Sequence, residues 1–369
     1  MRCLRGWVAL LAIGIASLPA CKSQSTDTSG ASSASAAEPS TAPKPQFVSP
    51  DQDCRGGRCL TTFASGQAGA GDLVMNETNV YWTAVGGLMS APKAGGGPVT
   101  VLVSGPVSTL AVDGASVFWA TEGTEDNLAV MRLALQGGSS SRLALQTGRT
   151  AGGRVIPSAM ALDASNVYWG VSVVGEHEGP DPAVMRTPKG GGTPETLAMG
   201  HGAPARLAVD STNVYWTADT EVLKVPLRGG TPSALAVGQD DPMHIAIDSS
   251  YVYWTSGGNG SGRISKVPLR GGRPTILVSG QGNIWGFAVD GTNVYWTNRP
   301  VAASLAGGDP GDDGSVLKLP VGGGTPTVLA THQRIAPGVI VDATSVYWST
   351  SPGSHGSATE WKIMKLTPK

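Results

Sequence analysis

The chain has 369 residues and a formal net charge of −1, with 52 Gly, 26 Pro and only 14% charged residues. This near-neutral balance excludes the broad basic surface of nucleic-acid-binding proteins, so we expect no nucleic acid partner. The many Gly and Pro residues disfavour long helices and favour short strands joined by tight turns.

The first 21 residues have the features of an export signal. Arg2 and Arg5 give a basic start, and the apolar run over 7–18 is too short to span a membrane. The segment ends in Leu-Pro-Ala-Cys, which resembles the lipobox of bacterial lipoproteins. The resemblance implies that Cys21 becomes the lipidated first residue of a protein in the bacterial cell envelope. Lys22 after the Cys implies the outer membrane in that family. The alternative is an ordinary cleaved signal with an incidental Cys.

Two segments follow the signal. Residues 22–50 are mostly Ser, Ala, Thr, Pro and Gly, which cannot bury enough apolar surface to fold, so we expect a disordered tether. A folded domain is expected over 51–369. It opens with Cys54 and Cys59, and an oxidising compartment favours a disulfide between them.

One short unit recurs along the rest of the chain. An apolar pair leads into Asp or Asn, a polar turn follows, and the unit closes with an aliphatic residue, an aromatic residue and Trp. The seven copies end at Trp82, Trp119, Trp169, Trp216, Trp254, Trp296 and Trp348. The copies lie 37 to 52 residues apart, a spacing that predicts a repeat architecture.

The fifth copy shows the organisation of a unit most clearly. Four short apolar or alternating runs cover 245–248, 252–255, 264–267 and 275–278, and turn residues separate them. Four strands per repeat predict an all-β, seven-bladed β-propeller, expected to be a monomer. Adjacent Tyr and Trp point to opposite faces of a blade, so each Trp can be buried by packing against the next blade.

The sequence also predicts how the ring closes. The seventh unit stops after its third strand, at 363–366, and has no fourth strand. A matching segment lies at the start of the domain, where 55–67 resembles 270–281 of the fifth unit. We therefore expect the N-terminal strand to complete the seventh blade.

The Val-Tyr-Trp-Thr runs at 80–83, 214–217, 252–255 and 294–297 resemble the YWTD repeats of extracellular receptor propellers. They are also similar to the repeats of NHL- and TolB-type bacterial propellers. Two features differ from the YWTD pattern: this chain has seven units rather than six, and other residues replace the Asp after Thr. The resemblance implies a propeller fold and a binding role, but not a ligand.

Two columns of charged residues repeat with the units. The turn carboxylates are Asp113, Asp163, Asp210, Asp248, Asp290 and Asp342, with Asn76 in the first unit. Because Asn serves equally well, we interpret them as Asx turns rather than catalytic groups. The third strands carry a basic residue each, interpreted as a solvated flank, at Arg132, Arg186, Lys224, Lys266, Lys318 and Lys365.

The connections between units are not equally regular. The turn from first to second strand and the Gly-Gly turn from third to fourth strand hardly vary. The other two classes, from second to third strand and from fourth strand to the next unit, vary in length and share one face of the ring, here called the variable rim. We expect function on this rim. It is rich in acidic residues; no cofactor is expected, although Asp309, Asp312 and Asp313 are weak candidates for binding calcium.

A second candidate site lies at the mouth of the central channel. Asp72, Arg206 and His244 stand at equivalent positions at the start of three first strands, and Arg206 and His244, in neighbouring blades, could converge there. Trp285 lies beside this ring of positions, and Trp361 ends a variable connection. These five residues are candidates for binding a peptide, sugar or carboxylate. Unrelated surface residues are the alternative interpretation.

Three function classes fit these features. The leading hypothesis is a non-enzymatic module, attached to the membrane only through its lipid, that binds a protein, peptide or glycan through the variable rim. The enzyme alternative is a propeller lyase or hydrolase that uses His244, Arg206 or Asp72, although the sequence contains no nucleophile–base signature. A structural spacer without a ligand is the third class.

Overall fold

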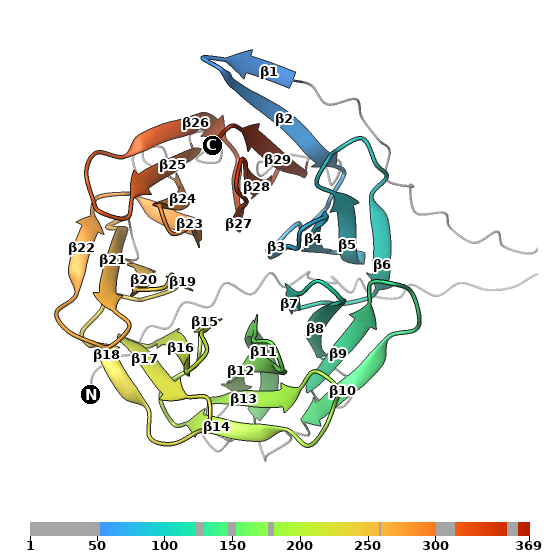
Figure 1. The fold of residues 1–369 in the computed structure, drawn as a ribbon, viewed down its shortest axis with the longest axis vertical. Coiled ribbons are helices and arrows are strands. Elements are labelled where there is room, and N and C mark those ends of the chain that lie inside the picture. Colours follow the sequence, from blue (N-terminus) through green and yellow to red (C-terminus); the bar gives the residue numbers. More distant parts are fainter. Residues whose placement is uncertain are drawn as a thin grey trace, which may run out of the picture. The chain divides into compact units, whose positions relative to one another are not determined.

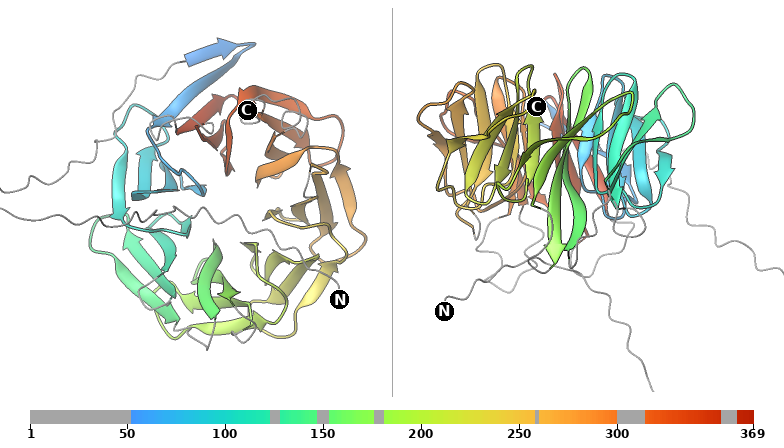
Figure 2. Two further views of the ribbon diagram at one scale, coloured as in Figure 1. Left: turned by 180° about the vertical axis from the view of Figure 1, so that it is seen from behind. Right: turned by 90° about the horizontal axis from the view of Figure 1, so that it is seen from below.

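The computed structural model describes residues 52–122, 128–146, 153–175, 181–257, 260–299, 314–352 and 361–369. In these ranges the regular structure consists of strands alone, arranged as seven antiparallel sheets around a central axis (Figure 1; Figure 2). The sheets belong to one compact unit, Pro45–Lys369. The prediction of an all-β, seven-bladed propeller is confirmed. Residues 1–51, with Cys21 and the tether, lie outside the described part, so their roles stay predictions.

Six blades use four consecutive strands each. Blade 1 consists of β3 (Leu73–Met75), β4 (Asn79–Ala84), β5 (Gly87–Pro92) and β6 (Thr100–Ser104). Blade 2 consists of β7 (Thr109–Val112), β8 (Ser116–Glu122), β9 (Leu128–Ala134) and β10 (Ser141–Gln146). Blade 3 consists of β11 (Gly153–Leu162), β12 (Asn166–Gly175), β13 (Ala183–Pro188) and β14 (Glu195–Met199).

The next three blades follow the same order. Blade 4 consists of β15 (Arg206–Val209), β16 (Asn213–Ala218), β17 (Glu221–Pro226) and β18 (Ser233–Ala236). Blade 5 consists of β19 (Ile245–Ile247), β20 (Tyr251–Ser256), β21 (Arg263–Pro268) and β22 (Thr275–Val278). Blade 6 consists of β23 (Asn283–Val289), β24 (Asn293–Arg299), β25 (Gly314–Pro320) and β26 (Thr327–Gln333).

Blade 7 joins the two ends of the domain. It consists of β27 (Ile335–Val341), β28 (Val346–Thr350), β29 (Lys362–Thr367), β2 (Arg58–Ser65) and β1 (Gln52–Arg55), in that order. The N-terminal strand β2 pairs with β29, with Thr61 opposite Lys365, as the sequence predicts. The described part of the chain holds no helix long and apolar enough to span a membrane.

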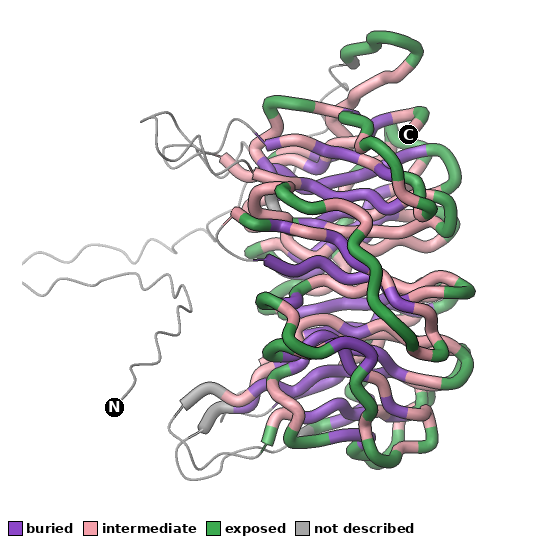
Figure 3. Tube along the Cα trace, turned by 90° about the vertical axis from the view of Figure 1, so that its left-hand side faces the viewer, coloured by how far each residue is buried: buried purple, intermediate pink, exposed green. Residues whose placement is uncertain are grey.

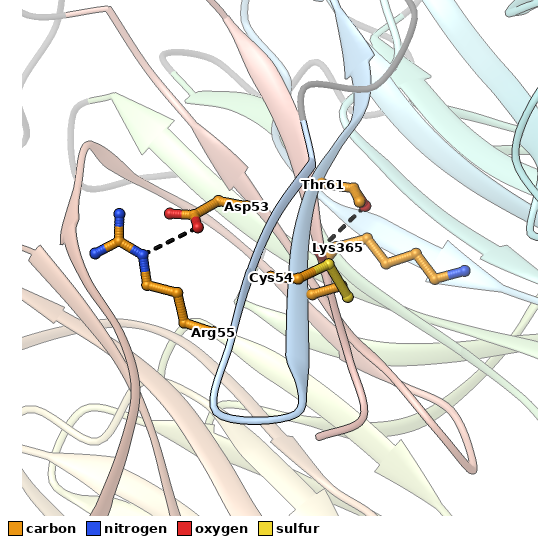
Figure 4. The surroundings of a disulfide bond; sticks show 6 residues. Asp53, Cys54, Arg55, Thr61 and Lys365 are labelled. Carbon is orange, nitrogen blue, oxygen red and sulfur yellow. Dashed lines mark hydrogen bonds and ion pairs between the residues drawn. A yellow bond between two sulfur atoms is a disulfide. The ribbon is translucent and has the colours of Figure 1, made fainter.

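The outermost strand β1 is an addition that the sequence analysis missed. The match of Arg-Gly-Gly-Arg to the fifth unit suggests a turn between a third and a fourth strand. In the structure this segment is instead the hairpin turn between β1 and β2, and β1 pairs with the outer edge of β2. Cys54 and Cys59 face each other across this hairpin and form the predicted disulfide (Figure 4). The Thr61 hydroxyl donates to the Lys365 carbonyl on the inner side of β2, 3.3 Å away.

Seven apolar clusters, one at each boundary between blades, form the core. In each cluster the repeat Trp of one blade packs with the repeat Tyr or Phe of the preceding blade. The prediction that each Trp packs against the next blade is therefore wrong in direction. All seven Trp side chains are buried. Buried segments run through the strands, and exposed ones concentrate in the turns and outer strands (Figure 3).

The turn carboxylates are Asx turns, as predicted. In blade 4 the Asp210 Oδ1 accepts hydrogen bonds from the main-chain N–H groups of Thr212 and Asn213, both at 2.7 Å. Its Oδ2 accepts from the hydroxyl of the repeat residue Tyr215, also at 2.7 Å. The Asp–Tyr bond recurs in blades 3, 5, 6 and 7 and fixes the second strand to the turn that precedes it.

The interpretation of the third-strand cations as a solvated flank is wrong for five of the six residues, and Arg132 donates instead to the Ser116 hydroxyl of its own blade, at 2.9 Å. Lys224 donates to the Leu269 carbonyl at 2.8 Å, in the turn between third and fourth strands of the following blade. The same bond to the following blade is made by Arg186, Lys266, Lys318 and Lys365. These side chains therefore connect neighbouring blades instead of facing water.

Candidate functional site

The two faces of the ring are built from different connections. One face carries the Asx turns and the Gly-Gly turns, whose main-chain groups are paired within the blades. The other face is the variable rim. Most of its long connections lie outside the described residues, including Asp309, Asp312 and Asp313. Among the described residues no group of three or more His, Cys, Asp or Glu side chains could hold a metal. Calcium binding stays a prediction.

A cavity of about 170 Å³ lies on the axis at the variable-rim end of the channel. The first strands of all seven blades contribute to its wall. Asp72, Arg206 and His244 all line it, together with Thr109 of blade 2. The structure therefore brings together the three candidate residues that the sequence places at equivalent positions of blades 1, 4 and 5.

An ion pair connects blades 1 and 4 in this cavity. The Arg206 Nη2 lies 3.4 Å from the Asp72 Oδ1, and the two side chains keep 39% and 28% of their surface exposed. The Arg206 Nη1 also donates to the Ala205 carbonyl at 3.1 Å. A single, partly hydrated contact of this length stabilises the fold little, so both groups remain accessible to a ligand.

His244 supplies a neutral imidazole to the same cavity. Burial in the channel wall and, secondly, the Arg206 guanidinium lower the pKa of His244 to about 3, although a hydrogen bond to the main chain of Trp285 acts in the opposite direction. The ring is therefore uncharged at neutral pH and serves as a hydrogen-bonding group rather than a cation.

Trp285 lies on the variable rim and is not among the residues that line the cavity, but its main chain is hydrogen-bonded to His244, which does line it. The pairing of β23 with β24 shifts between Ile284 and Gly286, so Trp285 is the extra residue of a β-bulge. Its side chain is 38% exposed, and the Arg299 guanidinium lies 4.7 Å from the ring centroid.

Trp361 occupies a different environment. It packs against the apolar cluster between blades 7 and 1, and its carbonyl accepts a hydrogen bond from the Gln67 N–H. It is not among the residues that line the cavity. The structure therefore does not bring Trp361 together with the other four candidates.

A second hollow, of about 530 Å³, lies where blades 1 and 2 meet at the variable rim. Val85, Val107 and Pro106 line it together with the carboxylate residue Glu122. Val85 is 79% exposed, the largest value among the large apolar side chains of the described residues. The sequence analysis missed this hollow because Val85 belongs to a short connection.

Solved structures show the same fold at low sequence identity. An oligogalacturonate lyase in complex with manganese matches with a TM-score of 0.58 and 11% identity, over 88% of this chain and 98% of that chain. YCF48 bound to D1 peptide matches with a TM-score of 0.56 and 11% identity, over 87% and 100%. A nidogen/laminin complex is less similar, with a TM-score of 0.47 and 16% identity, over 69% and 98%.

No protein-family model matches the sequence, and no curated protein does. At 11% identity the similarity to the lyase and to YCF48 concerns the fold alone. The chain therefore shares the β-propeller fold with proteins that differ widely in what they do.

Proposed function

We propose that this chain is a lipid-anchored, extracytoplasmic binding module that recognises a protein partner through the variable rim. It acts as a monomer held at the bacterial envelope by Cys21, with the propeller as a rigid platform.

The distribution of exposed apolar side chains carries this proposal. In the described residues, large exposed apolar side chains occur on the variable rim and along the outer strands, and the face of the Asx and Gly-Gly turns has none. Val85, Val237 and Met243 of the rim are 79%, 64% and 48% exposed. Val85 lines the hollow between blades 1 and 2, and Val237 and Met243 lie in the connection between blades 4 and 5, so the rim offers exposed apolar side chains at two places. Exposed apolar side chains of this kind are typical of protein-binding surfaces.

Two further observations support a binding role. A propeller of similar fold was solved with a bound peptide, namely YCF48 with D1 peptide. The hollow beside Val85 is large enough for several side chains of a partner, because ligand pockets are typically about 300–1,000 Å³.

The enzyme alternative has one observation in its favour. The Asp72 carboxylate and the His244 imidazole, two groups capable of proton transfer, line the same cavity, and Arg206 lies 3.4 Å from Asp72. A His with a pKa of about 3 is, however, a weak base at neutral pH, so this arrangement suits ligand binding better than proton transfer.

The test compares two triple variants of the full-length chain in affinity capture from envelope extract. The rim variant carries Val85→Ser, Val237→Ser and Met243→Ser. The control variant carries Val101→Ser, Ile276→Ser and Val328→Ser on the outer strands, where the parent side chains are 45%, 56% and 49% exposed. Loss of one partner from the rim variant alone is the expected result.

Equal capture by both variants would contradict rim binding and favour the spacer class. Trp285 is left unchanged in both variants, so the result does not depend on the axial cavity. The anchor is tested separately: Cys21→Ser should move the chain from the membrane fraction to the soluble fraction, and continued membrane retention would exclude lipidation at Cys21.

A further inference from the structure

The inner strands of the blades direct main-chain groups toward the axial cavity. The first strand of each blade is the inner edge of its sheet (Figure 1). In an antiparallel edge strand, alternate residues direct their N–H and C=O away from the partner strand. The His244 carbonyl accepts a hydrogen bond from Thr255 of β20, so the peptide groups of the next residue, Ile245, face the axis.

The side chains of several wall residues pack into the core between blades. Leu73, Leu110 and Leu207 line the cavity, yet their side chains belong to the apolar clusters between blades. The same holds for Ile245 and Val339. The cavity therefore offers hydrogen-bond donors and acceptors around its circumference, although its lining residues are mostly apolar.

The size of the cavity limits what it can hold. At about 170 Å³ it is smaller than the roughly 300–1,000 Å³ of sites for drug-sized ligands. One small ring fits, whereas a longer ligand would extend onto the rim.

The charges at the mouth limit the ligand further. Among the residues that line the cavity, Asp72 and Arg206 contribute one negative and one positive charge and His244 is neutral, so the lining itself has no net charge. The positive charge of Arg299 lies outside the lining, where its guanidinium is bonded to the Ile335 carbonyl. In the described residues the Asp72 carboxylate is bonded by one side chain, that of Arg206, through Oδ1. A ligand with hydroxyl groups can donate to the Asp72 carboxylate and accept from the Arg206 guanidinium without separating the ion pair.

An aromatic surface lies next to these polar groups. Trp285 is displaced from the strand pairing by the bulge, and its main chain is hydrogen-bonded to His244. Arg299 stacks on its indole and helps to fix its orientation. The electron-rich face of an exposed indole attracts polarised C–H groups, which a sugar ring presents on its flat side.

From these features we propose that the mouth of the axial cavity binds an uncharged sugar ring. Asp72 and Arg206 bond its hydroxyl groups, the main-chain groups of the inner strands complete the hydrogen bonding, and Trp285 packs against its C–H face. This site is distinct from the rim surface that includes Val85 and Val237, and it does not depend on the protein partner proposed above.

Isothermal titration calorimetry of the full-length chain tests the proposal. The probes are the methyl glycosides of glucose, galactose, mannose and N-acetylglucosamine, with galacturonate and glucosamine as charged counterparts. At least one neutral glycoside should bind with Kd below about 10 mM, and the charged sugars should bind at least about tenfold more weakly. Asp72→Asn and Trp285→Ala should each weaken binding of that glycoside by about tenfold or more.

Asp219→Asn is the matched control, because Asp219 lies on the same rim but does not line the cavity. The Kd of this variant for the glycoside should stay within about twofold of the parent value. Trp285 is exposed, so Trp285→Ala should fold even if Asp72→Asn does not. Three results would overturn the proposal: no neutral glycoside binds the folded parent, the charged sugars bind more tightly, or both variants bind as the parent does. The rim-capture experiment decides separately on the protein partner.

Discussion

At the scale of single residues, the turn carboxylates combine two functions. One oxygen closes the Asx turn, and the other accepts from the repeat Tyr. Blade 2 has Phe118 instead of Tyr, and there Lys189 of blade 3 lies 2.8 Å from the Asp113 Oδ2. The same type of ion pair to the preceding blade joins Lys93 to Asp342 and Lys369 to Asp290. These carboxylates therefore stabilise both the blade and its boundary.

The pH dependence of stability should reflect these carboxylates. Burial alone would raise their pKa, but hydrogen bonds outweigh it and lower the pKa of Asp113, Asp163, Asp210, Asp290 and Asp342. Their stabilisation is therefore present above the unfolded-state pKa of about 3.9 and is lost as pH falls further. The melting temperature should drop between about pH 4 and pH 2; a constant value there would contradict the assignment.

The partner Tyr residues should limit stability at high pH. Burial is the main cause that raises the pKa of these hydroxyl groups. The second cause is the hydrogen bond to Asp, except in blade 7, where the charge of Asp342 comes second. The residues are Tyr168, Tyr215, Tyr253, Tyr295 and Tyr347. Stabilisation by groups with a raised pKa is present below about pH 10 and lost above it.

Asp290→Asn should cost about 1–3 kcal/mol at pH 7 and flatten the fall in stability at low pH, whereas Asp219→Asn should change stability by less than about 0.5 kcal/mol.

At the scale of elements, the boundary between blades is the stabilising unit. Each one joins the repeat Tyr or Phe of one blade to the repeat Trp of the following blade. A Gln fifteen residues before Trp82, Trp254 or Trp348 accepts from the indole N–H. Since this Gln also precedes the first strand, it fixes the entry of the chain into the blade.

Trp216→Ala tests the contribution of one boundary. Trp216 is 1% exposed and packs with Tyr168 of blade 3, so its truncation leaves a cavity and should cost about 3–5 kcal/mol. Chemical denaturation followed by circular dichroism measures the loss. Val85→Ala is the control, with an expected change below about 0.5 kcal/mol because Val85 is 79% exposed. Equal stability of the Trp216 variant and the parent would remove Trp216 from the core.

The sequence was sufficient for features that repeat within one blade. The Trp periodicity, the Asx turns and the four-strand unit are local, so seven internal copies reveal them. Contacts between blades were not predictable in this way. Lys224 bonds a carbonyl 45 residues away, and only the rotation between neighbouring sheets brings the two together.

The position of the candidate site was predictable from the sequence, but which aromatic residues belong to it was not. Equivalent positions in the repeat placed Asp72, Arg206 and His244 at one end of the channel. The bulge that exposes Trp285 depends on how β23 pairs with β24, and the burial of Trp361 depends on ring closure. Neither has a signal in a single repeat.

At the scale of the whole molecule, ring closure by β2 determines whether the blades act as one unit. Deleting residues 52–65 should lower the denaturation midpoint of the entire ring, since it exposes the edge of β29 and removes the contact of Phe63 with Tyr347. Hydrogen exchange should report faster opening in every blade rather than fraying at one end.

The control keeps both strands and removes only the covalent link. Cys54→Ser with Cys59→Ser should cost under about 3 kcal/mol, since the closed loop is short. If the chain without 52–65 melts like the parent, β2 is not the closing strand.

The closure has a consequence for how the protein is made. β2 is among the first strands to be synthesised, but Thr61 bonds to a residue 304 positions later. Until β29 follows, β2 has an edge without its final partner, and such edges attract other chains. The β1–β2 hairpin is local and can form at once, so it protects the other edge during this interval.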